Sequence, residues 1–186
     1  MVSYGNPLID WVKEHTSFLL EPFAKVLHKS GLHPHVATIL SFCAGMLAAF
    51  FLFHDQTLFI IFGISHFVLD LFDGAVARAA KKTSSFGRWF DYATDRSVTV
   101  MLLLKCLFFF QNQLIIGILV LYILHNLIYV LHKGSIILFY SRTVLLFSLI
   151  LGYAWFGLLF TALSSGIGIL AQLLMMAERY HTKMRS

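Results

Sequence analysis

Long apolar runs separated by short polar segments make up most of the chain after residue 34. A helix that crosses a membrane needs about 20 mostly apolar residues, and these runs divide well at that length. The pattern therefore predicts an all-α integral membrane protein with six transmembrane helices. The first four spans are predicted at residues 36–54, 57–79, 89–110 and 114–131, and residues 136–178 are apolar enough for two more, with a turn near 155–157.

The first part of the chain has a different pattern, because residues 5–30 mix apolar side chains with six acidic or basic ones. Such a segment is too polar to span a membrane but fits an amphipathic helix that lies on its surface. Pro22 would interrupt this helix, and the segment from Gly31 to Pro34 would end it. We therefore expect a juxtamembrane helical segment over residues 1–33 and one transmembrane domain over residues 34–186.

Composition and charge agree with a membrane protein. Hydrophobic residues make up 59% of the chain, charged residues 12%, and the mean hydropathy is +0.80. The net charge of +5 does not indicate nucleic-acid binding, because the basic residues form short clusters between the apolar runs. If the N-terminus is cytoplasmic, the connections near 78–88 and 132–135 and the C-terminal tail are cytoplasmic too. Together with the N-terminal segment, these parts contain 11 of the 14 Lys and Arg residues. We expect a multi-pass protein with both termini on the cytoplasmic side.

The acidic residues are concentrated in one stretch, since four of the nine lie between residues 70 and 95. Asp70 and Asp73 are three residues apart near the cytoplasmic end of the second span, and Asp91 and Asp95 are four apart near the start of the third. Each spacing places its pair on one face of a helix. Because the two helices are consecutive and their connection is short, the four carboxylates are expected to converge just inside the membrane.

Four carboxylates at one site repel one another, and a carboxylate inside a membrane costs on the order of 2.5 to 3.5 kcal/mol. Bound divalent cations would compensate these charges. Ligands that are all carboxylate oxygens select Mg²⁺, Mn²⁺ or Ca²⁺ rather than Zn²⁺, and paired metal ions are typical of phosphoryl transfer. The alternative is a buried ion network with Arg78, Arg88 and Arg96, which does not account for the regular spacing of the acidic residues.

This stretch resembles the signature of the CDP-alcohol phosphotransferase (CDP-alcohol phosphatidyltransferase) family. That signature has two aspartates three apart, a glycine, an Ala-Arg pair, a second glycine and two aspartates four apart, at fixed gaps. All eight positions are present, as Asp70, Asp73, Gly74, Ala77, Arg78, Gly87, Asp91 and Asp95. The resemblance extends to six spans with a preceding amphipathic helix, and eight fixed positions make it specific.

The resemblance implies a role for each aspartate. The candidate metal-binding residues are Asp70, Asp73, Asp91 and Asp95. The first three would ligate two divalent cations, Mg²⁺ or Mn²⁺, with Asp95 near them. Asp95 would also act as the general base that takes the proton from the acceptor hydroxyl. This hydroxyl would attack the lipid-linked phosphorus of a CDP-lipid such as CDP-diacylglycerol or CDP-archaeol, and CMP would leave.

The resemblance also implies contacts to the CDP-lipid donor and a homodimer. Thr38, Gly74, Arg78 and Ser84 would hold the CDP moiety. Lys133 and Arg142, near the cytoplasmic ends of the fourth and fifth spans, are candidates to bind a phosphate-bearing acceptor such as inositol phosphate or glycerol phosphate. The excess of basic residues on the cytoplasmic side explains these two positions about equally well.

The function expected from these observations is that of a phospholipid-biosynthetic transferase that moves a phosphatidyl or archaetidyl group to a small alcohol. One alternative is an intramembrane prenyltransferase, but such enzymes are longer chains with more spans. Another is a divalent-cation transporter, in which the acidic residues would be expected nearer the bilayer centre than they are here. His66, one turn before Asp70, is interpreted as a polar packing residue, with a metal-ligand role as the less favoured alternative.

Overall fold

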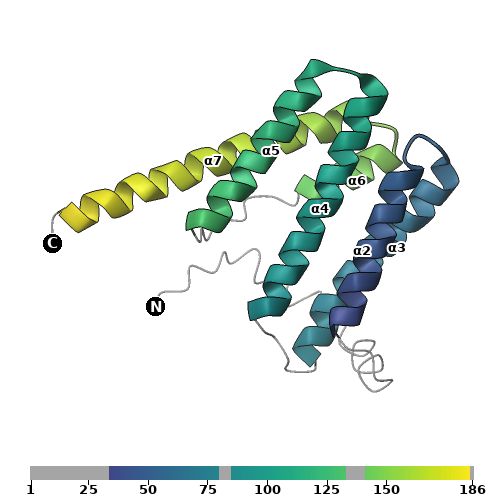
Figure 1. The fold of residues 1–186 in the computed structure, drawn as a ribbon, viewed down its shortest axis with the longest axis horizontal. Helices are drawn as coiled ribbons and strands as arrows, with labels where there is room; N and C mark the ends of the chain where they lie inside the picture. Colours follow the sequence, from purple (N-terminus) through teal and green to yellow (C-terminus); the bar gives the residue numbers. More distant parts are fainter. Residues whose placement is uncertain (1–33, 80–84, 133–140, 185–186) are drawn as a thin grey trace. The chain divides into compact units, whose positions relative to one another are not determined.

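The computed structural model describes residues 34–79, 85–132 and 141–184, and in this part of the chain every regular element is an α-helix (Figure 1). The all-α prediction is confirmed for these residues. The amphipathic helix predicted over residues 1–33 lies outside them. The helices, labelled as in Figure 1, are α2 (Pro34–Phe51), α3 (Gln56–Ala79), α4 (Ser85–Phe110), α5 (Gln113–His132), α6 (Ser141–Ile150) and α7 (Ala154–Met184).

The chain divides into two compact units, Met1–Val98 and Thr99–Ser186. In the first unit, α2 and α3 pack against each other as an antiparallel pair joined by a short turn (Figure 1). Phe53 adopts a φ of 67° in this turn, and the Asp55 carboxylate accepts a hydrogen bond of 3.0 Å from the Leu58 amide at the start of α3. An aspartate at this position satisfies an amide that the helix itself leaves without a partner.

Small side chains allow the helices of the first unit to approach closely. The buried residues of α2 include Ala37, Ala44 and Ala48, so its inner face is narrow. Gly45 continues this face, and a Cβ atom added there would lie 2.7 Å from a methyl group of Val98 on α4. Helices in membranes commonly associate through small residues in this way.

In the second unit, α7 packs against both α5 and α6. The sequence pattern predicted a turn near 155–157, but the structure places it at residues 151–153, between α6 and α7. Gly152 supplies the positive φ of 81° that the turn requires. Gly157 instead lies within α7, where an added Cβ would collide with the Ser148 hydroxyl on α6. The glycine that the pattern assigned to a turn therefore serves close packing between helices.

Two described helical segments, Gln113–Leu131 and Ala154–Glu178, are long and apolar enough to cross a membrane. Val36–Phe51, Gln56–Phe72 and Ser141–Ile150 are apolar over shorter lengths. Each of the six described helices also exposes large apolar side chains, among them Phe50, Ile61, Phe108, Val120, Phe147 and Leu163. Exposed apolar area on this scale marks a surface that contacts lipid or other proteins. The count of six spans stays a prediction.

Candidate metal centre

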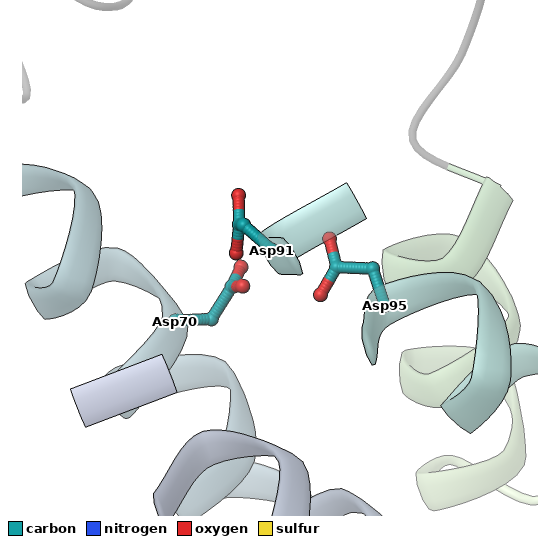
Figure 2. A group of neighbouring side chains, drawn as sticks. All are labelled: Asp70, Asp91 and Asp95. Carbon is teal, nitrogen blue, oxygen red and sulfur yellow. The ribbon is translucent and has the colours of Figure 1, made fainter. Parts of the chain in front are cut away.

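Three of the four signature aspartates come together in the structure. Asp70 projects from α3, and Asp91 and Asp95 project from α4 (Figure 2). Each offers one carboxylate oxygen, and these three oxygens all lie within 4.8 Å of one another. The three side chains are half-buried, and they form the one group of this kind among the residues that the structure describes.

The geometry follows from the two helices. Asp91 and Asp95 are four residues apart on α4, so they lie one above the other on the same face. That face is turned towards α3, where Asp70 points into the same space (Figure 2). The helical spacing of the aspartates predicted this meeting of the two faces, and it is confirmed for Asp70, Asp91 and Asp95.

The chemistry of this donor set fits a hard divalent cation. All three groups offer carboxylate oxygens, and oxygen ligands are the ones that Mg²⁺ and Mn²⁺ prefer. Without a cation, three negative charges would lie close together in half-buried positions, where their repulsion is poorly screened. The residues present can therefore hold a metal ion.

The other candidates on α3 belong to the same continuous helix as Asp70. Asp73, Gly74 and Arg78 all lie between Gln56 and Ala79, and their side chains are outside the described part of the structure. Ser84 and Lys133 lie outside the described residues altogether.

Two further predicted contacts have described side chains. Thr38 lies in the first turns of α2 in the first unit, and 7% of its surface is exposed. Arg142 is the second residue of α6 in the second unit and is 9% exposed. Both side chains are buried, and each lies near the N-terminal end of its helix.

His66, interpreted from the sequence as a polar packing residue, is confirmed as one, since it is 1% exposed and hydrogen-bonded to Ser41 on α2. Ser41 could not be identified from the sequence. A single serine in an apolar run is common, and its contact with His66 follows only from the register of α2 on α3.

Thr94, between the two aspartates of α4, was also missed. Its hydroxyl donates to the carbonyl oxygens of Phe90 at 3.0 Å and Asp91 at 2.9 Å, so its hydrogen bonds stay within the helix. Thr94 is buried, so the surface of α4 between Asp91 and Asp95 is covered by other parts of the protein.

The described fold and site define a helical protein that brings aspartates from two consecutive helices into one cluster that could bind a metal ion. The model of the CDP-alcohol phosphatidyltransferase family matches residues 32–182, and the chain belongs to this family.

Two curated relatives are similar to parts of the chain. The archaetidylinositol phosphate synthase of Pyrococcus horikoshii is 40% identical over 79 residues, which cover 41% of this chain and 42% of that protein. The bifunctional IPC transferase and DIPP synthase of Aquifex aeolicus is 38% identical over 65 residues, which cover 35% of this chain and 15% of that protein. The similarity thus spans less than half the length of either relative.

Proposed function

We propose that the protein transfers a phosphatidyl or archaetidyl group from a CDP-lipid to a small alcohol and releases CMP. The observation that carries this proposal is the convergence of Asp70, Asp91 and Asp95 from two helices, within 4.8 Å, in a chain of the CDP-alcohol phosphatidyltransferase family. A cluster of carboxylates at this spacing suits metal-assisted transfer of a substituted phosphate group.

Asp70, Asp73 and Asp91 are the proposed ligands of two divalent cations, Mg²⁺ or Mn²⁺, with Asp95 contributing beside them. When bound, these ions would offset the charge of the donor diphosphate and of the departing CMP. The aspartates would thereby also orient the donor, because ligands on two rigid helices hold the diphosphate in one position.

Asp95 is the proposed general base. Its carboxylate would accept the proton of the acceptor hydroxyl as the oxygen forms a bond to the lipid-bearing phosphorus. The bond from that phosphorus to the bridging oxygen breaks in the same displacement, and CMP leaves with this oxygen. The position of Asp95 one turn beyond Asp91 supports this role, because its carboxylate lies at the edge of the same cluster.

The proposed nucleotide contacts are Thr38, Gly74, Arg78 and Ser84. Arg78 lies two turns beyond Asp70 on α3, where a guanidinium could pair with phosphate oxygens in a bidentate manner. The buried hydroxyl of Thr38 would be a hydrogen-bonding group for the CDP moiety.

Inositol phosphate is the acceptor that we propose first, because the relative from Pyrococcus horikoshii is named an archaetidylinositol phosphate synthase. Lys133 and Arg142 are the proposed contacts to its phosphate, since cationic side chains suit a phosphorylated alcohol. We further propose a multi-pass homodimer whose active site and termini face the cytoplasm. The two long apolar helices and the positions of the basic residues support the membrane topology.

The test is release of CMP by the purified protein in lipid nanodiscs with Mg²⁺ or Mn²⁺. CDP-archaeol and CDP-diacylglycerol are each combined with inositol phosphate, glycerol phosphate, inositol or no acceptor. We expect CMP release that depends on the acceptor and is highest with inositol phosphate. No release above the no-acceptor control with any pair would overturn the proposal, and a parallel assay with isoprenyl diphosphates would reveal a prenyltransferase.

A further inference from the structure

Ser41 on α2 and His66 on α3 form a reciprocal pair of hydrogen bonds across the two helices. The Nδ1 atom of His66 lies 2.9 Å from the carbonyl oxygen of Ser41. In return, the Ser41 hydroxyl donates to the carbonyl oxygen of His66 at 3.1 Å. Nδ1 also lies 3.0 Å from the Ser41 hydroxyl oxygen. A carbonyl oxygen can only accept, so the 2.9 Å contact is a hydrogen bond in the tautomer that carries the ring proton on Nδ1.

This pair lies in a closed environment. His66 is 1% exposed and Ser41 is 3% exposed. Gly45, one turn after Ser41, leaves room for the ring, because a Cβ atom there would lie 3.1 Å from Nδ1 of His66. Buried polar groups of this kind need their partners, and a slip of α2 along α3 would leave the ring nitrogen and the hydroxyl without them. The pair therefore favours one register of the two helices.

That register has a consequence for the candidate active site. The two helices are antiparallel, so one turn back from Ser41 along α2 corresponds to one turn forward from His66 along α3. One turn back from Ser41 is Thr38, and one turn forward from His66 is Asp70. The Ser41–His66 pair thus holds Thr38, a proposed nucleotide contact, level with Asp70, a proposed metal ligand.

We propose that His66 is a positioning residue for the donor site: by bonding to Ser41 it sets the register of α2 on α3 and aligns Thr38 with Asp70 for binding of the CDP diphosphate. This inference rests on the proposed function. His66 itself does not contact the substrate in this proposal. Removal of its side chain should therefore weaken donor binding more than it slows the chemical step.

The test compares His66→Leu with His66→Asn. Leucine fills the space without a hydrogen-bond donor, whereas the amide nitrogen of asparagine can take the place of Nδ1 and donate to the Ser41 carbonyl. Thr161→Val is the matched control, because the Thr161 side chain is equally buried but its hydroxyl bonds at 2.8 Å to the Gly157 carbonyl within α7. Ser41→Ala, which removes the hydroxyl and keeps the carbonyl acceptor, serves as a milder variant should His66→Leu fail to fold.

Two measurements are made on each protein: Mn²⁺-dependent binding of CDP by calorimetry, which needs no turnover, and KM and kcat for the CDP-lipid. We expect His66→Leu to weaken CDP binding and raise KM by about tenfold or more, the range seen when groups that orient metal ligands are removed. We expect Ser41→Ala to show a smaller change in the same direction, His66→Asn to recover most of the affinity, and Thr161→Val to match the wild type.

Wild-type affinity in the folded His66→Leu variant would overturn the inference, as would equal losses in His66→Leu and His66→Asn. If His66→Leu does not fold, wild-type CDP affinity in Ser41→Ala would overturn it. A wild-type protein that binds no CDP with Mn²⁺ would also overturn it. Binding of CDP without any release of CMP would instead overturn the proposed function and leave the positioning role in place.

Discussion

Asp70 and Asp95 offer carboxylate oxygens within 4.8 Å of each other, although they belong to different helices. Two like charges 4.8 Å apart repel by about 3.5 kcal/mol at an effective dielectric constant near 20. Asp91 adds a third carboxylate to the same space. The arrangement is therefore expected to favour a bound cation. Removal of the cation should destabilise the packing of α3 against α4.

We expect different losses from Asp70→Asn and Asp95→Asn. Asp70→Asn removes a proposed metal ligand, so both Mn²⁺ binding and CMP release should fall. Asp95→Asn removes the proposed base, so CMP release should fall by about 10²- to 10⁴-fold while Mn²⁺ binding is largely retained. Mn²⁺ binding is measured by electron paramagnetic resonance on the same samples that are assayed for turnover.

Asp55→Asn is the control for these substitutions. Asp55 is exposed and accepts the Leu58 amide at the start of α3, a role that asparagine also performs well. Activity and Mn²⁺ binding should match the wild type. Near-normal turnover in Asp95→Asn would remove the general-base assignment and leave the metal assignment standing.

Removal of divalent cations should abolish CMP release and lower the thermal stability of the protein. Treatment with a chelator followed by Mg²⁺ or Mn²⁺ should restore both, whereas Zn²⁺ should restore them poorly, because the described ligands are all carboxylates. At a cation concentration 100 times its dissociation constant, the stabilisation would be about 2.7 kcal/mol. The measurement is the unfolding temperature in nanodiscs with and without each ion, and an Asp91→Asn variant should lose the response.

Gly45→Ala should destabilise the first unit. The new Cβ would lie 2.7 Å from one methyl group of Val98 and 3.0 Å from the other, and a valine cannot turn both away without moving α4. Overpacking of this kind costs about 1 to 3 kcal/mol. Thermal unfolding and CMP release should both show the loss.

Gly117→Ala is the matched control, because an added Cβ on α5 meets no atom within 4 Å. It should be neutral or should stabilise the helix by up to about 1 kcal/mol, because alanine has a higher helix propensity than glycine. Equal effects of the two substitutions would contradict the close approach of α2 and α4 at Gly45.

A charge in the middle of α5 should disfavour its insertion into a membrane. Val120 is 57% exposed within the apolar segment Gln113–Leu131, so Val120→Lys would place an ammonium group in lipid. The expected cost is about 2.5 to 3.5 kcal/mol at the helix centre. A glycosylation reporter that scores insertion of the segment measures it, with Val120→Leu as the control. Equal insertion of the lysine and leucine variants would contradict a spanning role for α5.

Much of the fold could be predicted from the sequence, because its determinants are local. Apolar runs of helical length predicted α2 to α5 to within a few residues, and the four-residue spacing of Asp91 and Asp95 placed both on one face of α4. The short connection between α3 and α4 then allowed Asp70 to be placed opposite them. These arguments need only the helix period and the length of a loop.

Other features depended on how whole helices pack, which no spacing within a single helix determines. Gly152 and Gly157 are both plausible turn residues in the sequence, and only the contact of Gly157 with Ser148 shows that the second serves packing while the first forms the turn. The partner of His66 depended in the same way on the register of two helices.

The sequence by itself thus determined the helical class, the family signature and the aspartates that carry the proposed chemistry. Only the tertiary structure decided that Ser41 on α2 pairs with His66 on α3. The physical reason is that a side chain's position on its own helix follows from a period of 3.6 residues, whereas its neighbour on another helix follows from the rotation and sliding of the two helices, which all their packed side chains set together.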